Sequence, residues 1–188
     1  TNQYHFKPVY ITGISFISAL GGYLFGFDFA VIAGALPFLK EQFGFDEVQE
    51  GFATASLALG CILGCLLAGR ISDRWGRRKG LMLAASVFFI SSLAMAFSHN
   101  SVLFIVSRFA AGIGVGMASV LSPMYIAEVA PAHMRGRMVA INQLTVVIGI
   151  FVTNLVNYSL RNEGVDAWRW MVGLGAVPSA VFLLGVCW

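Results

Sequence analysis

Two ionisable residues of opposite charge lie well inside apolar stretches of this sequence. Asp28 is the only charged residue between Ile11 and Leu39, and Arg108 lies in the apolar run that begins near Ser101. A charge in hydrocarbon is costly, so each should face a partner or a water-filled cavity. A carboxylate whose surroundings change can bind and release a proton, whereas an arginine keeps its charge. The two residues therefore suit either a static ion pair or a protonatable site in a transport pathway.

The elements that must position these charges are long apolar segments. Of the 188 residues, 58% are hydrophobic and only 11% are charged, against about a quarter charged in ordinary globular proteins. A bilayer requires about 20 helical residues per crossing, and open sheet edges cannot face lipid. We therefore expect an all-α membrane protein of six transmembrane helices. Their approximate limits are 9–37, 49–69, 80–98, 101–127, 138–160 and 168–188.

The charges between the spans predict an orientation. The segment 70–79 carries five basic residues against one acid, and the segment 128–137 carries two arginines against one acid. The intervening segments are mostly acidic. The positive-inside rule places the basic segments in the cytoplasm, and six spans return both termini to that side. The expected location is therefore a cell membrane, plasma or inner, crossed several times.

With this orientation, the rise of an α-helix allows the depths of the two charges to be compared. Asp28 precedes the outer end of its span, near Pro37, by about 13 Å at 1.5 Å per residue. Arg108 follows the outer start of its span, near Ser101, by about 10 Å. The two charges are expected at similar depth, somewhat outside the midplane, where they can pair.

The fifth span carries a polar stripe on one helical face. Carboxamides on this face can hydrogen-bond a hydroxyl-rich ligand, although hydrogen bonds between helices explain Asn154 and Asn157 equally well. Phe25 lies one turn before Asp28 on its face, a position that by itself indicates packing. The members of the stripe are Gln143, Val147, Ile150, Asn154 and Asn157.

Other chemistries have little support in the sequence. The three cysteines lie in apolar runs with no nearby histidine, so we expect no metal site, disulfide or cofactor. The run GIGVG at 112–116 follows no strand, which favours helix packing over nucleotide binding. A net charge of +3 is too small to indicate a nucleic-acid partner. Because His5, His99 and His133 lie at ends or in loops, an intramembrane serine protease is not expected either.

Two stretches resemble signatures of a known family. The sequence GRISDRWGRRKG at 69–80 resembles the loop 2–3 signature of the major facilitator superfamily. The sequence RFAAGIGVGMASVLSPMYIAEVAPAHMRGR at 108–137 resembles the sugar porter signature. With FGFD in the first span and NQL in the fifth, the resemblance covers the whole chain. It implies that residues 1–188 form one domain, the N-terminal six-helix half of a twelve-helix transporter with two inverted three-helix repeats.

The resemblance also implies roles for individual residues. Asp28 matches the acid of proton-linked sugar porters, where facilitative members usually carry asparagine, and Arg108 matches its partner. Gln143 matches a glutamine that binds sugar hydroxyls, and Phe25 matches an aromatic residue that lines the same pocket. Ile150 stands where some relatives have a second glutamine, so it bears on the choice of sugar. Asn154 is a further candidate sugar contact from the polar stripe.

A network of charges at the cytoplasmic end is implied by the same resemblance. In the family it holds the two halves together in the outward-facing state. Positive-inside topology explains the arginines but gives no reason for two acids on the basic side. The matching residues are Asp73, Arg77, Glu128 and Arg135.

The expected function is that of a proton-coupled monosaccharide symporter, represented by its N-terminal half. Its partners would be the sugar, the proton, the lipid bilayer and a C-terminal six-helix half that is not part of these 188 residues. Most sugar contacts of the family come from that half, so we expect an incomplete pathway. Two alternatives share the fold: a facilitative sugar uniporter and an antiporter of another small solute. A stand-alone half that acts only in folding or assembly is a third.

Overall fold

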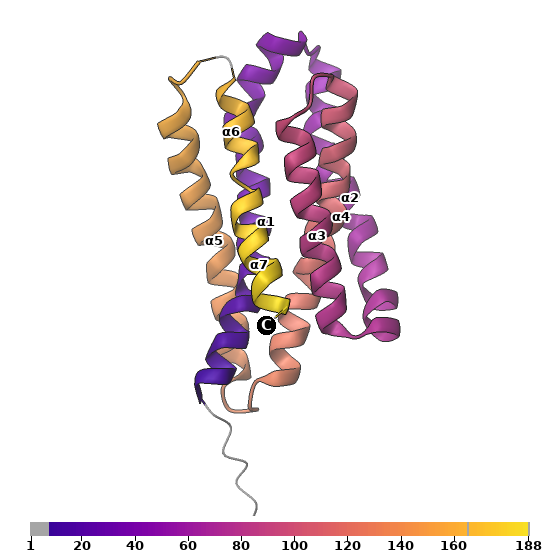
Figure 1. Ribbon diagram of the computed structural model, residues 1–188, viewed down its shortest axis with the longest axis vertical. Helices are drawn as coiled ribbons and strands as arrows, with labels where there is room; N and C mark the ends of the chain where they lie inside the picture. Colours follow the sequence, from indigo (N-terminus) through magenta and orange to yellow (C-terminus); the bar gives the residue numbers. More distant parts are fainter. Residues whose placement is uncertain (1–7, 165, 188) are drawn as a thin grey trace, which may run out of the picture.

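The computed structural model describes residues 8–164 and 166–187, and it is built there of helices joined by short connections (Figure 1). Six segments are long and apolar enough to cross a membrane, and α6 and α7 together make the sixth. The predicted set of six spans is therefore confirmed. The helices are α1 Pro8–Phe43, α2 Glu47–Trp75, α3 Arg77–Ala96, α4 Ser101–Val129, α5 Arg135–Leu160, α6 Ala167–Gly173 and α7 Ala176–Cys187.

Helices continue into two of the segments that were expected to connect spans, so the predicted limits there are wrong. The first helix continues past Pro37 to Phe43 because its last turns pack in the core, where Leu39 is fully buried. The segment 70–79 is almost entirely helical rather than a loop. Only Gly76 interrupts it, and the φ angle of +85° at this residue lets α3 begin directly after α2.

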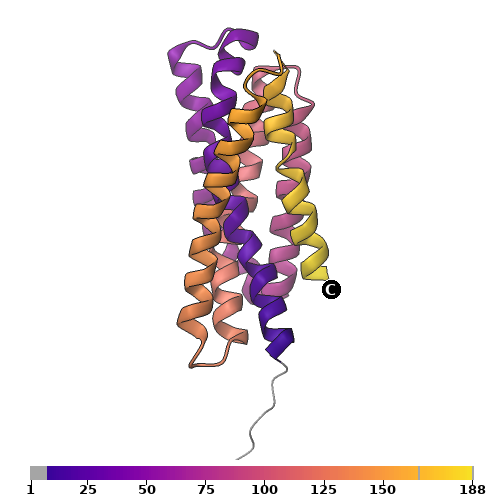
Figure 2. The same cartoon turned by 90° about the vertical axis from the view of Figure 1, so that its left-hand side faces the viewer.

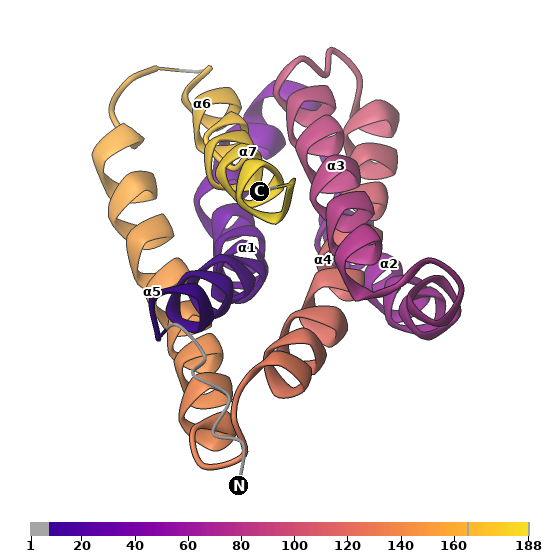
Figure 3. The same cartoon turned by 60° about the horizontal axis from the view of Figure 1, so that its bottom comes forward.

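The helices pack as two clusters, each built around one central helix. Helix α1 packs with α5, α6 and α7, while α4 packs with α2 and α3 (Figure 3). The two central helices contact each other, and α3 contacts α7. The two repeats make equivalent contacts: α1 packs against the second and third spans of the second repeat, and α4 packs against the second and third spans of the first. The packing is therefore that of two inverted three-helix repeats, in which each central helix is surrounded by helices of the other repeat.

Glycines bring each central helix close to one neighbour. On the α2–α4 contact, a Cβ added at Gly60 would meet the carbonyl oxygen of Phe109, and one at Gly116 would meet the backbone of Cys61. The α1–α5 contact repeats this arrangement, because a Cβ at Gly149 would lie 2.6 Å from the carbonyl oxygen of Tyr23. Small residues allow this close approach of backbones, which drives helix association in membranes.

The sixth span was expected to be one helix, and the structure corrects this. Pro178 has no N–H to donate to the carbonyl of Leu174, and its ring would clash with that carbonyl in a continuous helix. The oxygen of Leu174 instead accepts a hydrogen bond from the N–H of Val177, at 3.2 Å. Helix α6 therefore ends at Gly173 and α7 begins at Ala176.

The connections alternate between the two ends of the bundle. The start of α1, the α2–α3 and α4–α5 connections and the end of α7 lie toward one end (Figure 1). The α1–α2, α3–α4 and α5–α6 connections lie toward the other end (Figure 2). This arrangement gathers the basic segments 70–79 and 128–137 at one end, as the sequence predicts.

Candidate functional site

The two charges inside the spans form an ion pair between the central helices. Arg108 donates from Nη1 to Oδ1 of Asp28 at 3.4 Å, and from Nη2 to the backbone oxygen of Asp28 at 3.2 Å. Arg108 is 0% exposed and Asp28 is 1% exposed. The predicted pairing is confirmed. Because the arginine holds both the side chain and the backbone of Asp28, it ties α4 directly to the main chain of α1.

The pair leaves part of its hydrogen-bonding capacity unused. Among the described residues, Oδ2 of Asp28 and Nε of Arg108 have no hydrogen-bond partner, although both atoms are buried. A buried polar atom without a partner is costly, and such atoms mark strained or functional positions. The free carboxylate oxygen can accept a proton without first breaking a hydrogen bond. Arg108 therefore hydrogen-bonds only one of the two carboxylate oxygens of Asp28.

The polar stripe of α5 divides into two faces. Gln143 and Asn154 are exposed, and the Asn154 side chain donates to the carbonyl of Ile150 in its own helix at 2.9 Å. Asn157 is buried and donates to the carbonyl of Ala30 on α1 at 3.2 Å. The interhelical explanation is thus confirmed for Asn157. The exposed face of α5 keeps the two amides that can reach a ligand.

Phe25 lies on α1 and Ile150 lies on α5, near the contact between these two helices. Phe25 is half-buried and stacks on Phe29, with ring centroids 6.3 Å apart and the planes at 10°. Its neighbour Gly26 packs against the α5 backbone at Val146 and Ile150, so these residues lie at the same level. Phe29 is 63% exposed and was missed in the sequence. Its signal was the spacing of four residues from Phe25.

Two further polar residues of α5 were also missed. Thr145 donates from Oγ1 to the carbonyl of Ala19 on α1 at 2.7 Å. Asn142 is buried against α1, and its Oδ1 has no hydrogen-bond partner in the described part of the chain. These residues share the α1-facing side of α5 with Gly149 and Thr153. Small and polar residues recurring every three or four positions were the signal that could have found them.

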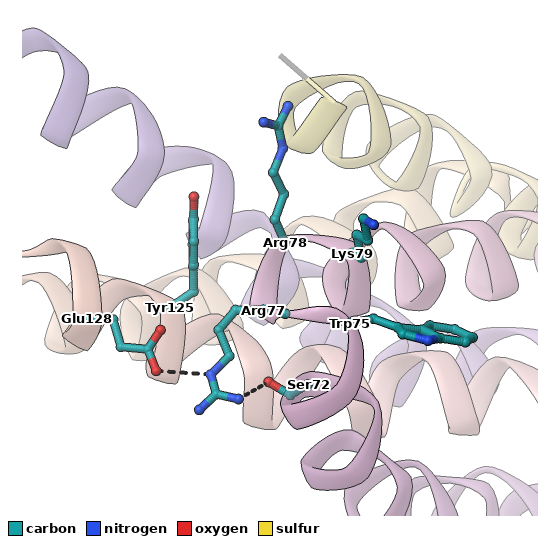
Figure 4. Close-up of a pocket in the computed structure, with 8 residues that line it drawn as sticks. Ser72, Trp75, Arg77, Arg78, Lys79, Tyr125 and Glu128 are labelled. Carbon is teal, nitrogen blue, oxygen red and sulfur yellow. Dashed lines mark hydrogen bonds and ion pairs between the residues drawn. The ribbon is translucent and has the colours of Figure 1, made fainter.

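Three of the four predicted network residues meet at the opposite end of α4. Arg77 donates from Nε to Oε1 of Glu128 at 2.9 Å, and from Nη1 to Oδ1 of Asp73 at 3.1 Å. Figure 4 shows its guanidinium between Glu128 and Ser72, to which Nη1 also donates. Within the described residues, no hydrogen bond or ion pair of the Arg135 side chain is found; its backbone N–H donates to the carbonyl of Pro131 at 3.0 Å.

The network borders a cavity of about 570 Å³ at the α2–α3 turn. Glu128 follows Arg108 by twenty residues along α4, or about 30 Å of helix at 1.5 Å per residue, so the network and the buried pair are separate sites. Arg78 points away from the network and donates from Nε to the carbonyl of Val186 at the end of α7. The cavity is lined by Ser72, Trp75, Gly76, Arg77, Arg78, Lys79, Tyr125 and Glu128.

Comparison with known proteins shows which family this chain belongs to. Residues 14–188 match the family model "Sugar (and other) transporter". The D-xylose transporter of Levilactobacillus brevis is 43% identical over 172 residues, which cover 92% of this chain and 37% of that protein. The D-xylose-proton symporter of Escherichia coli K12 is 39% identical over 211 residues, covering 95% of this chain and 43% of that protein.

Solved structures give the same result. The proton:xylose symporter XylE, bound to 6-bromo-6-deoxy-D-glucose, superimposes with a TM-score of 0.91 at 37% identity, covering 97% of this chain and 45% of that one. The inward open conformation of XylE from E. coli gives 0.88 at 38% identity. The chain thus spans less than half the length of these relatives. It belongs to the sugar transporter family of the major facilitator superfamily, as a multi-pass membrane chain that corresponds to the N-terminal portion of proton:sugar symporters.

Proposed function

We propose that this chain carries the proton site and part of the sugar site of a proton-coupled monosaccharide symporter. The complete transporter would add a second six-helix half. The observation that carries the proposal is the buried Asp28–Arg108 pair, in which Oδ2 of the carboxylate has no hydrogen-bond partner among the described residues. Relatives whose names include a proton symporter of xylose and one of arabinose support the substrate class.

Asp28 binds and releases the proton, and Arg108 is its fixed partner. Protonation of Oδ2 neutralises the carboxylate, so the attraction that joins α1 to α4 weakens. Release of the proton restores the charge and the attraction. Arg108 keeps its charge throughout because a guanidinium does not deprotonate in proteins. The proton state of one side chain is thereby linked to the contact between the two central helices.

The sugar is held against the exposed face of α5 and the neighbouring part of α1. Gln143 donates and accepts hydrogen bonds with sugar hydroxyls, and Phe25 offers an apolar surface beside them. Asn154 adds a second amide by giving up its hydrogen bond to the carbonyl of Ile150. The apolar side chain of Ile150 limits the hydrogen bonds at its level, which affects the choice of sugar. Amides are poorly suited to lipid, so this face is covered by the second half and a wet cavity.

The charges around Arg77 act as a latch at the cytoplasmic end. The ion pairs of Arg77 with Asp73 and Glu128 join the α2–α3 turn to the end of α4. Arg135 lies at the start of α5 on the same end and would join the network in another conformation. The basic segments support a cytoplasmic location for this end, and for both ends of the described chain, in a plasma or inner membrane.

Replacing Asp28 by asparagine tests the proton site. In the complete transporter, we expect Asp28→Asn to abolish uphill, proton-driven uptake while sugar binding and exchange remain. The change keeps the size and hydrogen-bonding capacity of the side chain and removes only its titratable proton. The measurement is sugar-induced alkalinisation of the medium, alongside equilibrium sugar binding.

A matched control is Asp166→Asn, which removes an exposed carboxylate paired with Arg169. This variant should keep uphill uptake. If the Asp28→Asn transporter still concentrates sugar against a gradient, Asp28 is only a structural partner of Arg108. A transporter that equilibrates sugar without moving protons in its unaltered form would instead be a facilitator.

Replacing Gln143 by alanine tests the sugar site. We expect the affinity for sugar to fall about fivefold or more, because each lost hydrogen bond is worth about 1 kcal/mol. Isothermal titration of the purified transporter measures this affinity. Asn157→Ala is the control, since that amide contacts α1 rather than the exposed face; it should lower thermal stability and keep the affinity. Unchanged affinity in Gln143→Ala would assign Gln143 to packing.

A further inference from the structure

We propose that Gly175, at the break between α6 and α7, is a positioning residue for the Asp28–Arg108 pair and acts through Phe27. This inference rests on the proposed function, because it concerns the geometry of the same proton site. No part of the sugar or proton chemistry described above uses the α6–α7 break. Helices α6 and α7 nevertheless both pack against α1 (Figure 3), and Gly175 lies against Phe27, the residue before Asp28.

The pair depends on the position of the α1 main chain as well as on two side chains. One of the two Arg108 hydrogen bonds goes to the backbone oxygen of Asp28, at 3.2 Å. The bond to the carboxylate, at 3.4 Å, is already long. A side chain can turn to follow its partner, but a backbone oxygen moves only with its helix. A small displacement of α1 at this level therefore changes both bonds.

Helix α5 and the α6–α7 break contact α1 at the same level. On the α5 side, a Cβ at Gly149 would lie 3.2 Å from the backbone nitrogen of Phe27, so the two backbones are in contact. On the α6–α7 side, a Cβ at Gly175 would lie 2.7 Å from Cε1 and 3.2 Å from Cδ1 of the Phe27 ring. Phe27 directly precedes Asp28. Contacts from α4, α5 and the α6–α7 break thus meet at two consecutive residues of α1.

The Phe27 ring has little freedom to move away from Gly175. It is 3% exposed and stacks on Tyr23 with ring centroids 6.4 Å apart and the planes at 26°. Added volume in a packed interior forces side chains off their rotamers or shifts the backbone. A methyl group at position 175 would therefore push the ring, and with it the main chain that carries Asp28.

Two residues of the sixth span create the space that the Phe27 ring occupies. Pro178 interrupts the helix by removing the N–H that would bond to Leu174, and Gly175 leaves the space beside the interruption empty of side chain. A continuous helix with a larger residue at 175 would place atoms where the ring now lies. The break thus provides a site of fixed shape for Phe27.

The test compares alanine at two glycines of the same span in the complete transporter. Gly175→Ala should reduce proton-driven accumulation on the order of tenfold or more, since a misplacement of about 1 Å can cost up to a hundredfold. Sugar exchange, which needs no net proton movement, should stay within about twofold of the unaltered protein. Gly173→Ala is the matched control: its new Cβ would meet Cβ of Ala96 on α3 at 3.3 Å and lies away from Phe27.

A compensating change separates positioning from general damage. Phe27→Leu removes the ring atom nearest to Gly175, so the double variant Gly175→Ala/Phe27→Leu should regain most of the accumulation that Gly175→Ala loses. Equal loss in the double variant, equal loss in Gly173→Ala, or loss of exchange together with accumulation would each overturn the positioning role. The last result would assign Gly175 to packing alone.

The outcome for this inference is distinguishable from the outcome for the proposed function. If the unaltered transporter shows no proton-driven accumulation, the proposed function fails, whatever Gly175→Ala does. If the unaltered transporter accumulates sugar and Gly175→Ala accumulates it equally well, only the positioning role fails. Melting temperatures in detergent of the unaltered protein, Gly175→Ala, Phe27→Leu and the double variant give the coupling between positions 175 and 27 independently of sugar and protons.

Discussion

The buried Asp28–Arg108 pair and the network around Arg77 lie about 30 Å apart along α4, and they differ in burial and in the number of their contacts. The side chains of Arg108 and Asp28 are 0% and 2% exposed and share one long contact. Arg77 is partly exposed and makes two contacts of 3.1 Å or less with acids that are themselves exposed. The cluster with the poorer geometry is therefore the one removed from water.

This difference in burial indicates that the two clusters would respond to different changes. A buried pair loses the hydration of both charges, so its net stability depends on every remaining contact, and a single proton changes its balance. Exposed pairs keep most of their hydration, are screened by salt, and contribute little whether formed or broken. The buried pair is thus suited to respond to protonation, and the exposed network is suited to open and close at low cost.

Removing the buried arginine should have the largest effect on stability. Arg108→Gln leaves the Asp28 carboxylate buried without a cation, which costs about 3–5 kcal/mol. The expected fall in melting temperature is on the order of 10 °C. Thermal unfolding in detergent measures it. The double variant Asp28→Asn/Arg108→Gln should melt at a higher temperature than Arg108→Gln, because no charge is then left buried. A double variant as unstable as the single one would mean that the two residues contribute through shape rather than charge.

Removing the exposed arginine should have a much smaller effect. Arg77→Gln loses two ion pairs that water and salt already weaken, so we expect the melting temperature to fall by roughly 2 °C or less. The difference from the unaltered protein should shrink as the salt concentration rises, whereas that of Arg108→Gln should not. A fall comparable to that of Arg108→Gln would remove the contrast between the two clusters.

The smallest effect is expected for Arg135, the predicted network residue whose side chain has no hydrogen bond or ion pair among the described residues. Arg135→Gln should leave the melting temperature unchanged within error, because the substitution keeps the backbone hydrogen bond to Pro131 and removes no side-chain interaction found in the described part of the chain. Sugar uptake by the complete transporter is measured in parallel. Lower uptake at an unchanged melting temperature would support a contact formed in another conformation. A fall in melting temperature like that of Arg77→Gln would place Arg135 in the network of this conformation.

Several properties of this protein are determined by the sequence alone. A bilayer leaves the backbone few options besides helix, so apolar runs of sufficient length predicted all six spans. The alternating basic and acidic segments predicted an orientation, and two long motifs identified the family. The depths of Asp28 and Arg108 could be compared because the rise of a helix is constant. These are local properties, readable from composition and spacing within one segment.

Other properties were decided only by the tertiary structure. Asp28 and Arg108 are eighty residues apart, and their contact depends on how closely α1 and α4 pack. Of the amides on α5, Asn142 and Asn157 are buried and Gln143 and Asn154 are exposed, because α1 covers only one side of that helix. Arg135 carries the same charge as Arg77, yet it makes none of the network's contacts.

The physical reason is that side-chain contacts depend on the distances and rotations between helices. The hydropathy of a segment does not predict these distances and rotations, because lipid and protein interior are both apolar. Glycines at the α1–α5 and α2–α4 contacts set the distances, and the break at Pro178 admits the Phe27 ring beside Asp28. Each of these residues is visible in the sequence, but only the folded arrangement shows which backbone or ring occupies the space it leaves.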